Sequence, residues 1–313
     1  MTVLLNRSTI LRALDIPTVL DNLRAGFTQH PEIAPQRVRT DLPGPGTATT
    51  LLPGLLPGIP AYTVKVNAKF PTATPALRGI ICLHDLTDGT LLAILDSTTL
   101  TAWRTGLSAA LATNLLAPHG TEGSAVVGVV GAGVQAGMVV RGLDALGGVE
   151  GLVVCDVDRE RAAGFLGELG IPGVVVGSAV EVVGRADVVV LATWSREPLL
   201  GVADVRGGVH LTTLGADEPG KVELSAELLR AARVVVDDRE LAVRMGALGN
   251  VGLGTEAAHA TLSEVLTGRA AGRSTADEIT VYAPVGLPWQ DLAIAWPVYQ
   301  SAKEHGATID FLG

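Results

Sequence analysis

The segment 125–136, AVVGVVGAGVQA, most constrains how this chain can fold. A run of small and β-branched apolar residues leads into a glycine turn, and an apolar stripe at helical spacing follows. Gly131 permits a tight turn, Gly133 lets a phosphate approach the backbone, and the small Ala136 lets the helix pack on the strand. The helix N-terminus would present free N–H groups to an anion. The pattern therefore predicts a dinucleotide-binding unit.

An acidic residue follows the next apolar run, residues 152–155. This residue, Asp156, lies 25 positions after Gly131. An acid at about this distance from the glycine turn contacts the adenosine ribose hydroxyls of NAD, and it would repel a 2′-phosphate. The position therefore favours NAD over NADP. The alternative is that Asp156 only caps the helix expected from Arg159.

Composition limits the classes of protein that this chain can be. Its 313 residues suffice for two hydrophobic cores, and its net charge of −9, with no basic cluster, argues against nucleic acid or an anionic membrane as partner. Cys82 and Cys155 lie in apolar runs and are expected to be buried and reduced. The spacing of His, Cys, Asp and Glu resembles no metal site, so no metal is expected. Without a cleavable signal pattern or an apolar window long enough to span a bilayer, the expected location is cytoplasmic.

The apolar pattern divides the chain into a strand-rich part and a part in which strands and helices alternate. Two short helices are expected in 8–27, the second capped by Asp15, and antiparallel strands follow up to residue 96. In 61–70, Lys65 shares a polar face with other odd-numbered residues, which predicts a half-buried strand with a solvated lysine. The segment that begins at Asp96 is expected to continue as a helix through Leu116. A last helix is expected from Trp289 to about His305, with a kink at Pro297. Between these helices the expected strands are 125–130, 152–155, 174–176, 186–193, 209–214, 234–237 and 279–282.

Several segments in order along the chain resemble the ornithine cyclodeaminase/μ-crystallin family of NAD(P)-dependent oxidoreductases. They are KVN at 65–67 with Pro71, LD at 95–96, TAWRT at 101–105, GAGVQA at 131–136, Asp187 with ATWS at 192–195, LGADEPGKVEL at 214–224, VG at 285–286 and DL at 291–292. The resemblance implies an α/β fold in which a Rossmann dinucleotide-binding domain is inserted into an α+β substrate-binding and dimerisation domain. The implied ranges are 1–120 plus 290–313 for the substrate and dimerisation domain and 121–289 for the Rossmann NAD-binding domain. The resemblance also implies a homodimer that transfers a hydride at the Cα of an amino or imino acid.

The resemblance assigns three cations to the substrate carboxylate. Lys65 matches the family's carboxylate-binding lysine, with a catalytic role, and Arg104 matches the arginine of the RT motif. An arginine expected near the start of a helix opposes the helix dipole, which suggests that it is held for an anion; the alternative is a surface ion pair. Arg37 matches a second carboxylate-binding arginine, and Arg39 is a near alternative because the match slips in the Pro-Gly loops.

The resemblance also assigns a catalytic aspartate and the cofactor contacts. Asp217 matches the aspartate that takes or returns a proton as the amine becomes an iminium; the alternative is an ordinary turn aspartate before Pro219. The expected cofactor-binding residues are Gly131, Gly133, Val134, Gln135, Asp156, Thr193 and Lys221.

Three departures from the family pattern make the expected pocket more apolar. Cyclodeaminases proper carry an acidic residue ahead of a Met-Pro pair, but this chain has TTLLP at 49–53 and no Asp or Glu between Asp41 and Asp85. Trp194 replaces a smaller residue, and AP at 283–284 replaces a Lys-Ser pair. The expected function is therefore that of an NAD-dependent oxidoreductase of a small amino acid or cyclic imino acid, similar to alanine dehydrogenase or ketimine reductase. The alternatives are ornithine cyclodeaminase, which forms proline and ammonia, and a slow or inactive protein that binds NAD(P)H and a small ligand.

Overall fold

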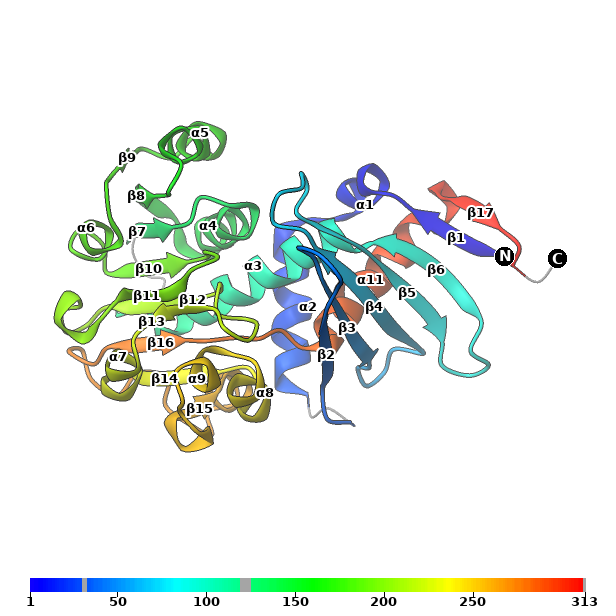
Figure 1. Ribbon diagram of the computed structural model, residues 1–313. Helices are drawn as coiled ribbons and strands as arrows, with labels where there is room; N and C mark the ends of the chain where they lie inside the picture. The colour runs from blue at the N-terminus through cyan, green and yellow to red at the C-terminus, as the bar shows by residue number, and fades with distance from the viewer. Residues whose placement is uncertain (30–32, 119–124, 312–313) are drawn as a thin grey trace. The chain divides into compact units, whose positions relative to one another are not determined.

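The computed structural model describes residues 1–29, 33–118 and 125–311 (Figure 1). The chain divides into two compact units, one formed by Met1–Arg104 with Leu287–Gly313 and the other by Thr105–Gly286. The expected domain boundary at residues 120–121 lies outside the described residues, so the functional domain ranges remain a prediction. The described residues include no helix that is both long enough and apolar enough to cross a membrane.

The first unit is built on a seven-stranded mixed sheet in the order β17-β1-β6-β5-β4-β3-β2. Neighbouring strands are antiparallel except for β1 and β6, which are parallel. The strands are β1 (Thr2–Leu5), β2 (Gln36–Asp41), β3 (Thr47–Gly54), β4 (Ala61–Lys69), β5 (Leu77–Asp85), β6 (Leu91–Asp96) and β17 (Ala307–Ile309). The helices are α1 (Arg7–Ala13), α2 (Ile16–Thr28) and α11 (Pro288–Ala302), which is followed by the 3₁₀ turn η3 (Lys303–His305).

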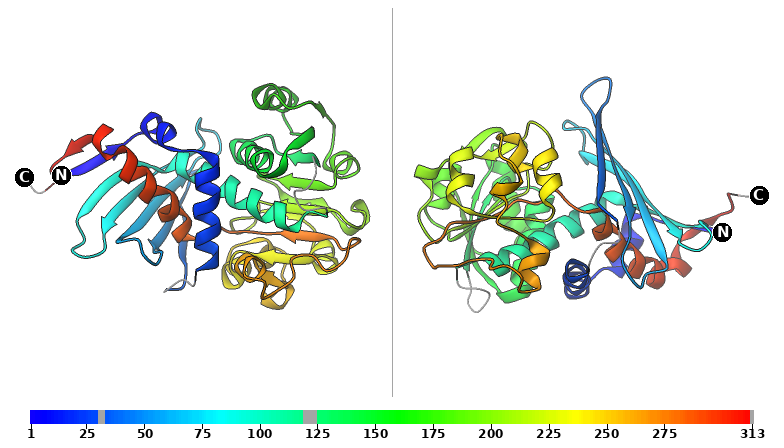
Figure 2. Two further views of the ribbon diagram at one scale, coloured as in Figure 1. Left: turned by 180° about the vertical axis from the view of Figure 1, so that it is seen from behind. Right: turned by 90° about the horizontal axis from the view of Figure 1, so that it is seen from below.

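Helices α2 and α11 lie on the same face of this sheet, as the two opposite views of Figures 1 and 2 show. Asp15 caps α2 as expected, because its carboxylate accepts a hydrogen bond from the Thr18 N–H at 2.9 Å. Phe27 at the end of α2 packs edge-to-face against Trp289 of α11, with 4.8 Å between ring centroids. The apolar side of α2 and the first turns of α11 thus form one core with the covered face of the sheet.

The second unit contains an eight-stranded parallel sheet in the order β15-β14-β16-β12-β10-β7-β8-β9. Its strands are β7 (Ala125–Val130), β8 (Val149–Cys155), β9 (Gly173–Val175), β10 (Val188–Leu191), β12 (His210–Thr213), β14 (Arg233–Val236), β15 (Ala260–Thr261) and β16 (Thr280–Tyr282). The boundary between the two units, after Arg104, falls within α3 (Ser97–Leu116). The other helices of the second unit are α4 (Val134–Gly147), α5 (Arg159–Leu169), α6 (Ala179–Val183), α7 (Ala226–Ala231), α8 (Arg239–Arg244), α9 (Ala247–Asn250) and α10 (Leu262–Leu266). Two short strands, β11 (Arg196–Leu200) and β13 (Val222–Leu224), form a separate parallel pair, and η1 (Val202–Asp204) and η2 (Thr255–Ala257) are 3₁₀ turns. The expected dinucleotide-binding α/β fold is confirmed.

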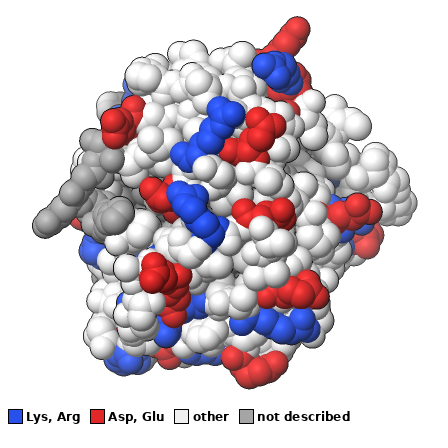
Figure 3. All heavy atoms as spheres, turned by 90° about the vertical axis from the view of Figure 1, so that its left-hand side faces the viewer, with Lys and Arg blue, Asp and Glu red and all other residues white. Residues whose placement is uncertain are grey.

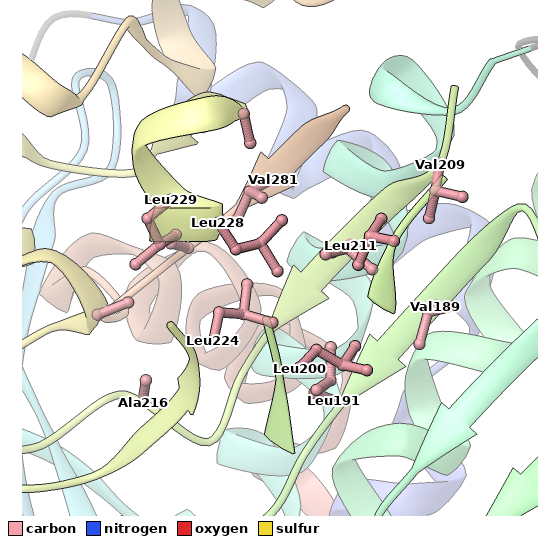
Figure 4. Packing of buried hydrophobic residues seen from close by; sticks show 14 of the residues in the cluster. Val189, Leu191, Leu200, Val209, Leu211, Ala216, Leu224, Leu228, Leu229 and Val281 are labelled. Carbon is pink, nitrogen blue, oxygen red and sulfur yellow. The ribbon is translucent and has the colours of Figure 1, made fainter. Parts of the chain in front are cut away.

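Alternate residues of the parallel strands face two different cores. Val189, Leu191 and Leu211 belong to a buried cluster that also includes residues of α6 and α7 (Figure 4). On the other face, Thr212 is hydrogen-bonded to Thr113 of α3 at 2.7 Å between hydroxyl oxygens. Strands buried on both faces explain why the sequence shows continuous apolar runs here instead of alternation.

The first unit differs from the sequence-based expectation in its strands. The strand β3 is eight residues long in a segment rich in Pro-Gly pairs, because its own Pro53 lies near the strand end. Strands β1 and β17 were not expected; each is very short and lies at or near the sheet edge, where alternation carries little signal. Cys82 and Cys155 are free and only partly buried, which corrects the expectation of full burial.

Candidate functional site

The glycine loop after β7 has the conformation that a dinucleotide-binding turn requires. Gly131 has φ +92°, and a Cβ there would lie 2.6 Å from the carbonyl oxygen of Ala192. Its N–H donates to the Cys155 carbonyl at 2.8 Å, which ties the turn to the end of β8. Only glycine fits at this position, both for its dihedral angle and for its space.

The start of α4 leaves room for an anion. Gly133 is the N-cap of this helix, and a Cβ there would meet no atom within 4 Å. Val134 and Gln135 form the first positions of the helix, and the side chain of Val134 is exposed. Backbone N–H groups and the positive end of the helix dipole are therefore available to the pyrophosphate of a dinucleotide, and the residues present fit NAD.

Asp156, at the end of β8, is attached to the same loop. Its carboxylate accepts a hydrogen bond from the Ala132 N–H at 2.8 Å and lies 3.8 Å from an Arg161 guanidinium nitrogen. The N-cap of α5 is Asp158, which accepts bonds from two N–H groups of the first turn. The alternative assignment of Asp156 as the helix cap is therefore wrong, and its carboxylate belongs to the glycine loop.

A buried glutamate that the sequence did not single out links the ends of β10 and β12. Glu223 accepts hydrogen bonds from the Thr193 N–H and hydroxyl, both at 2.7 Å, from the Thr213 hydroxyl at 2.6 Å and from the Gly215 N–H at 2.9 Å. Burial raises the pKa of Glu223, and these hydrogen bonds oppose the rise. Two hydrogen bonds to Glu223 therefore hold Thr193, an expected cofactor-binding residue, in position after the end of β10. The only sequence signal was its place in the matched segment 214–224.

Asp217 and Lys221 form an ion pair in the loop after β12. The Lys221 ammonium lies 3.0 Å from the Asp217 carboxylate, 3.7 Å from that of Glu218 and 4.5 Å from the ring centroid of Trp194. The Asp217 side chain keeps 22% of its surface exposed, so a substrate proton can reach it. The loop after a strand's carboxyl end is the ordinary place for ligand-binding residues in a parallel sheet.

In the first unit, the structure places Lys65 in the interior, which rules out the solvated lysine that the strand pattern alone predicted. Its side chain is 1% exposed, and its neighbours Thr63 and Asn67 on the same face of β4 are also buried, while Val66 on the opposite face is 45% exposed. The ammonium lies 2.8 and 2.7 Å from the two carboxylate oxygens of Asp291 in α11. Desolvation, followed by the charge of Arg104, lowers the pKa of Lys65 to about 7, although Asp291 opposes this.

Arg104 is buried and directed at the same carboxylate. Its Nε lies 3.6 Å from Asp291, and its Nη1 donates to the side-chain oxygen of Gln290 at 3.3 Å. Because α3 begins at Ser97, Arg104 lies two turns into the helix and does not oppose the dipole at the helix start, contrary to expectation. Burial beside Lys65 is the better reason to regard it as an anion-binding group.

Arg37 joins this cluster through the register of the sheet. Arg37 pairs with Leu51, and Leu51 pairs with Lys65, so the three side chains share the covered face. Arg37 is buried and its charge contributes to lowering the pKa of Lys65. Arg39, two residues along the same face, forms an ion pair with Asp41 at 2.7 Å. The contacts favour Arg37 over Arg39 as the second carboxylate-binding arginine.

The chain matches the model of the "Ornithine cyclodeaminase/mu-crystallin family" over residues 2–306. It is 36% identical to an alanine dehydrogenase of Archaeoglobus fulgidus over 247 residues, covering 76% of this chain and 75% of the relative. It is 32% identical to the ketimine reductase mu-crystallin of Mus musculus, covering 79% of this chain and 80% of the relative. A Bacillus cereus Δ1-pyrroline-2-carboxylate reductase is 30% identical, with 86% of each chain covered.

Solved structures of similar proteins have the same fold. An archaeal alanine dehydrogenase dimer with bound NAD superposes with a TM-score of 0.89 at 29% identity, covering 99% of each chain. A Thermococcus litoralis Δ1-pyrroline-2-carboxylate reductase in complex with NADH and L-proline gives a TM-score of 0.89 at 28% identity, covering 98% of this chain and 100% of the relative. The similarity therefore extends over the whole length of this chain.

Proposed function

This chain belongs to the ornithine cyclodeaminase/mu-crystallin family, and we propose on that premise that it transfers a hydride between NAD and the Cα of a small amino acid or cyclic imino acid. It is an oxidoreductase of amino or imino acids, and its cofactor is NAD. The observation that carries the finer proposal is the buried cluster of Lys65, Arg37 and Arg104, whose positive charge suits the carboxylate of such a substrate.

Leu51, which lies between Arg37 and Lys65, supports a substrate with an apolar side chain. Leu51 lies on the covered face between Arg37 and Lys65 and is 3% exposed. No acidic residue is present in 42–84 to pair with the distal ammonium of a diamino acid. Burying that ammonium without a counter-charge would cost several kcal/mol, which favours substrates such as alanine or a pyrroline carboxylate over ornithine.

Each candidate residue would have a distinct role in the reaction. Lys65, Arg37 and Arg104 would bind the α-carboxylate and fix the orientation of the Cα. Asp217, whose carboxylate lies 3.0 Å from the Lys221 ammonium, would accept a proton from the amine during oxidation and return it during reduction. When bound, NAD supplies the hydride acceptor or donor. Gly131, Gly133, Val134, Gln135 and Asp156 would hold its phosphates and ribose.

The test is an absorbance assay at the NADH band with a panel of amino acids plus NAD⁺ and of cyclic imines plus NADH. L-alanine, L-proline and Δ1-pyrroline-2-carboxylate belong in the panel, and ammonia and proline are measured with L-ornithine in parallel. A net change in NADH with an apolar substrate is expected. Proline and ammonia from ornithine without net NADH would instead establish a cyclodeaminase, and bound NADH without turnover would support a binding protein.

Replacing Asp217 tests its assignment as the proton-transfer group. Asp217→Asn should bind NADH with unchanged affinity, measured by nucleotide fluorescence, but lower kcat by about 100-fold or more. Glu218→Gln removes a carboxylate that contacts the same lysine and is the matched control, for which a much smaller loss is expected. An active Asp217→Asn enzyme would show that another group moves the proton.

The proposal extends to assembly and location. An archaeal relative is described as a dimer, and the first unit exposes Val38, Val66 and Ile80 on one face of its sheet. Exposed apolar residues that share one face commonly mark a protein interface, so a homodimer is proposed. With free cysteines and no described membrane-spanning helix, the proposed location is the cytoplasm.

A further inference from the structure

Asp291 is the carboxylate around which the buried cations of the first unit are arranged. It lies in the first turn of α11 and is 1% exposed. Both of its oxygens are within 2.8 Å of the Lys65 ammonium, and one lies 3.6 Å from Nε of Arg104. The neighbouring Gln290 accepts from Arg104 and from the Leu287 N–H, so the same turn holds the guanidinium.

Without this carboxylate, every charged group that acts on Lys65 would be a cation. The charged groups that act on Lys65 are Arg104 from α3, Arg37 from β2 and Asp291 from α11. Two of them are cations, and burial itself also disfavours an ammonium. Asp291 is the acidic group among these three.

We propose that Asp291 is a positioning residue that keeps Lys65 protonated and holds Lys65 and Arg104 ready for the substrate carboxylate. The inference rests on the proposed function for the identity of that ligand, but the state of Lys65 is a property of the free protein. In the free protein, the Asp291 carboxylate occupies the lysine. When a substrate binds, its carboxylate adds a second negative charge to a cluster that has two further cations.

The lysine content of the chain makes a direct test practical. The sequence has four lysines, Lys65, Lys69, Lys221 and Lys303, so the protein labelled with [¹³Cε]lysine gives few signals, and Lys65→Met assigns one of them. In the wild-type protein without ligand, the Lys65 signal should titrate near pH 7. In Asp291→Asn it should titrate about one pH unit or more lower, because the opposing carboxylate charge is lost.

The matched control removes the same charge elsewhere in the first unit. Asp41 is exposed and pairs with Arg39, so Asp41→Asn should leave the Lys65 titration unchanged. A Lys65 signal that titrates identically in the wild type and in Asp291→Asn would overturn the proposal. So would a wild-type Lys65 that titrates at the ordinary lysine value.

Kinetics separate positioning from a merely structural role. At pH 6.5, where most of the wild-type Lys65 is still the ammonium, Asp291→Asn should raise KM for the best substrate by about tenfold or more, with a smaller change in kcat, because the lost contact orders a charged binding group. The pH above which kcat/KM declines should move down together with the Lys65 titration. A fall in kcat at unchanged KM would contradict the proposal.

Asp291→Glu keeps the test decisive if Asp291→Asn does not fold. This variant retains the charge but moves the carboxylate by one methylene, so Lys65 should still titrate near pH 7 while KM rises. A wild-type KM in Asp291→Glu would contradict the positioning role. If the wild-type protein turned over no amino or imino acid, the proposed function would fail, whereas the titration would still decide the role of Asp291.

Discussion

At the scale of single residues, His210 makes the stability of the second unit depend on pH. Its ring lies fully buried in β12, with both nitrogens 2.9 Å from threonine hydroxyls, those of Thr280 and Thr212. Desolvation, with a smaller effect of Arg273, lowers the pKa of His210 to about 3. The folded state thus favours the neutral imidazole, which offers one donor and one acceptor to the hydroxyls.

The sign of the resulting pH dependence follows from this lowered pKa. The contribution of His210 to the free energy of unfolding is fully present above its unfolded-state pKa of about 6.5. It is lost as the pH falls from there toward 3, by about 1.4 kcal/mol per pH unit. Urea unfolding at pH 5.0, 6.0 and 7.5 should show a steeper loss in the wild type than in His210→Gln, which lacks the titrating ring. Equal slopes would show that His210 is already accessible to protons in the folded state.

Some residues of the candidate site could be predicted from the sequence and others could not. The glycine loop could be predicted because Gly131 and Gly133 meet local requirements of backbone angle and space. Lys65 could not be placed from its strand pattern, because its burial depends on Asp291, which lies 226 positions later in the chain. Glu223 was missed for the same reason, since its four donors come from three separate positions along the chain.

At the scale of elements, α3 and α4 pack so closely that a glycine is required between them. A Cβ at Gly142 of α4 would lie 2.6 Å from Cβ of Ala110 and 2.8 Å from Cδ2 of Leu107, both buried residues of α3. Gly142→Ala should therefore destabilise the protein by about 1–3 kcal/mol through overpacking. Thermal unfolding followed by circular dichroism measures the effect.

A glycine in another helix provides the control for helix propensity. Gly164 in α5 has no neighbour within 4 Å of a Cβ position. Gly164→Ala should therefore stabilise the protein by about 0.5–1 kcal/mol, because alanine favours the helix and nothing obstructs it. Stabilisation by both substitutions would show that α3 and α4 can separate without cost.

Element types were predictable where a segment satisfied its own pattern. The helix capped by Asp15 and the apolar parallel strands have local signals, and the structure confirms them. The pair β11 and β13 has three to five residues per strand, too few for a periodic pattern, and depends on pairing between distant segments. Such elements are determined by tertiary contacts rather than by local sequence.

At the scale of the whole molecule, a net charge of −9 disfavours association with polyanions. The face drawn in Figure 3 shows Lys and Arg interspersed with Asp and Glu, without a large region of one sign. Together with the net charge of −9, this agrees with a partner that is a small molecule or a second copy of the chain. The remaining question at this scale is therefore assembly.

The proposed homodimer predicts that the exposed apolar residues of the first unit lie in its interface. Val38, Val66 and Ile80 lie in one row of the sheet, connected through Thr50, on the face opposite Lys65. A charge placed in an interface of this kind must be desolvated without a partner, which disfavours association by several kcal/mol. Val66→Glu should therefore convert a particle of twice the chain mass of 32.2 kDa into a monomer, as measured by sedimentation velocity.

Val180→Glu is the control that separates loss of an interface from added charge. Val180 in α6 of the second unit is 46% exposed, against 45% for Val66, so the two substitutions change the same residue type at equal exposure. The control should remain a dimer, and both variants should keep the wild-type circular dichroism spectrum. A Val66→Glu protein that sediments as the wild type does would exclude this sheet face from the interface. Dissociation of the Val180→Glu protein alone would place the interface on the second unit.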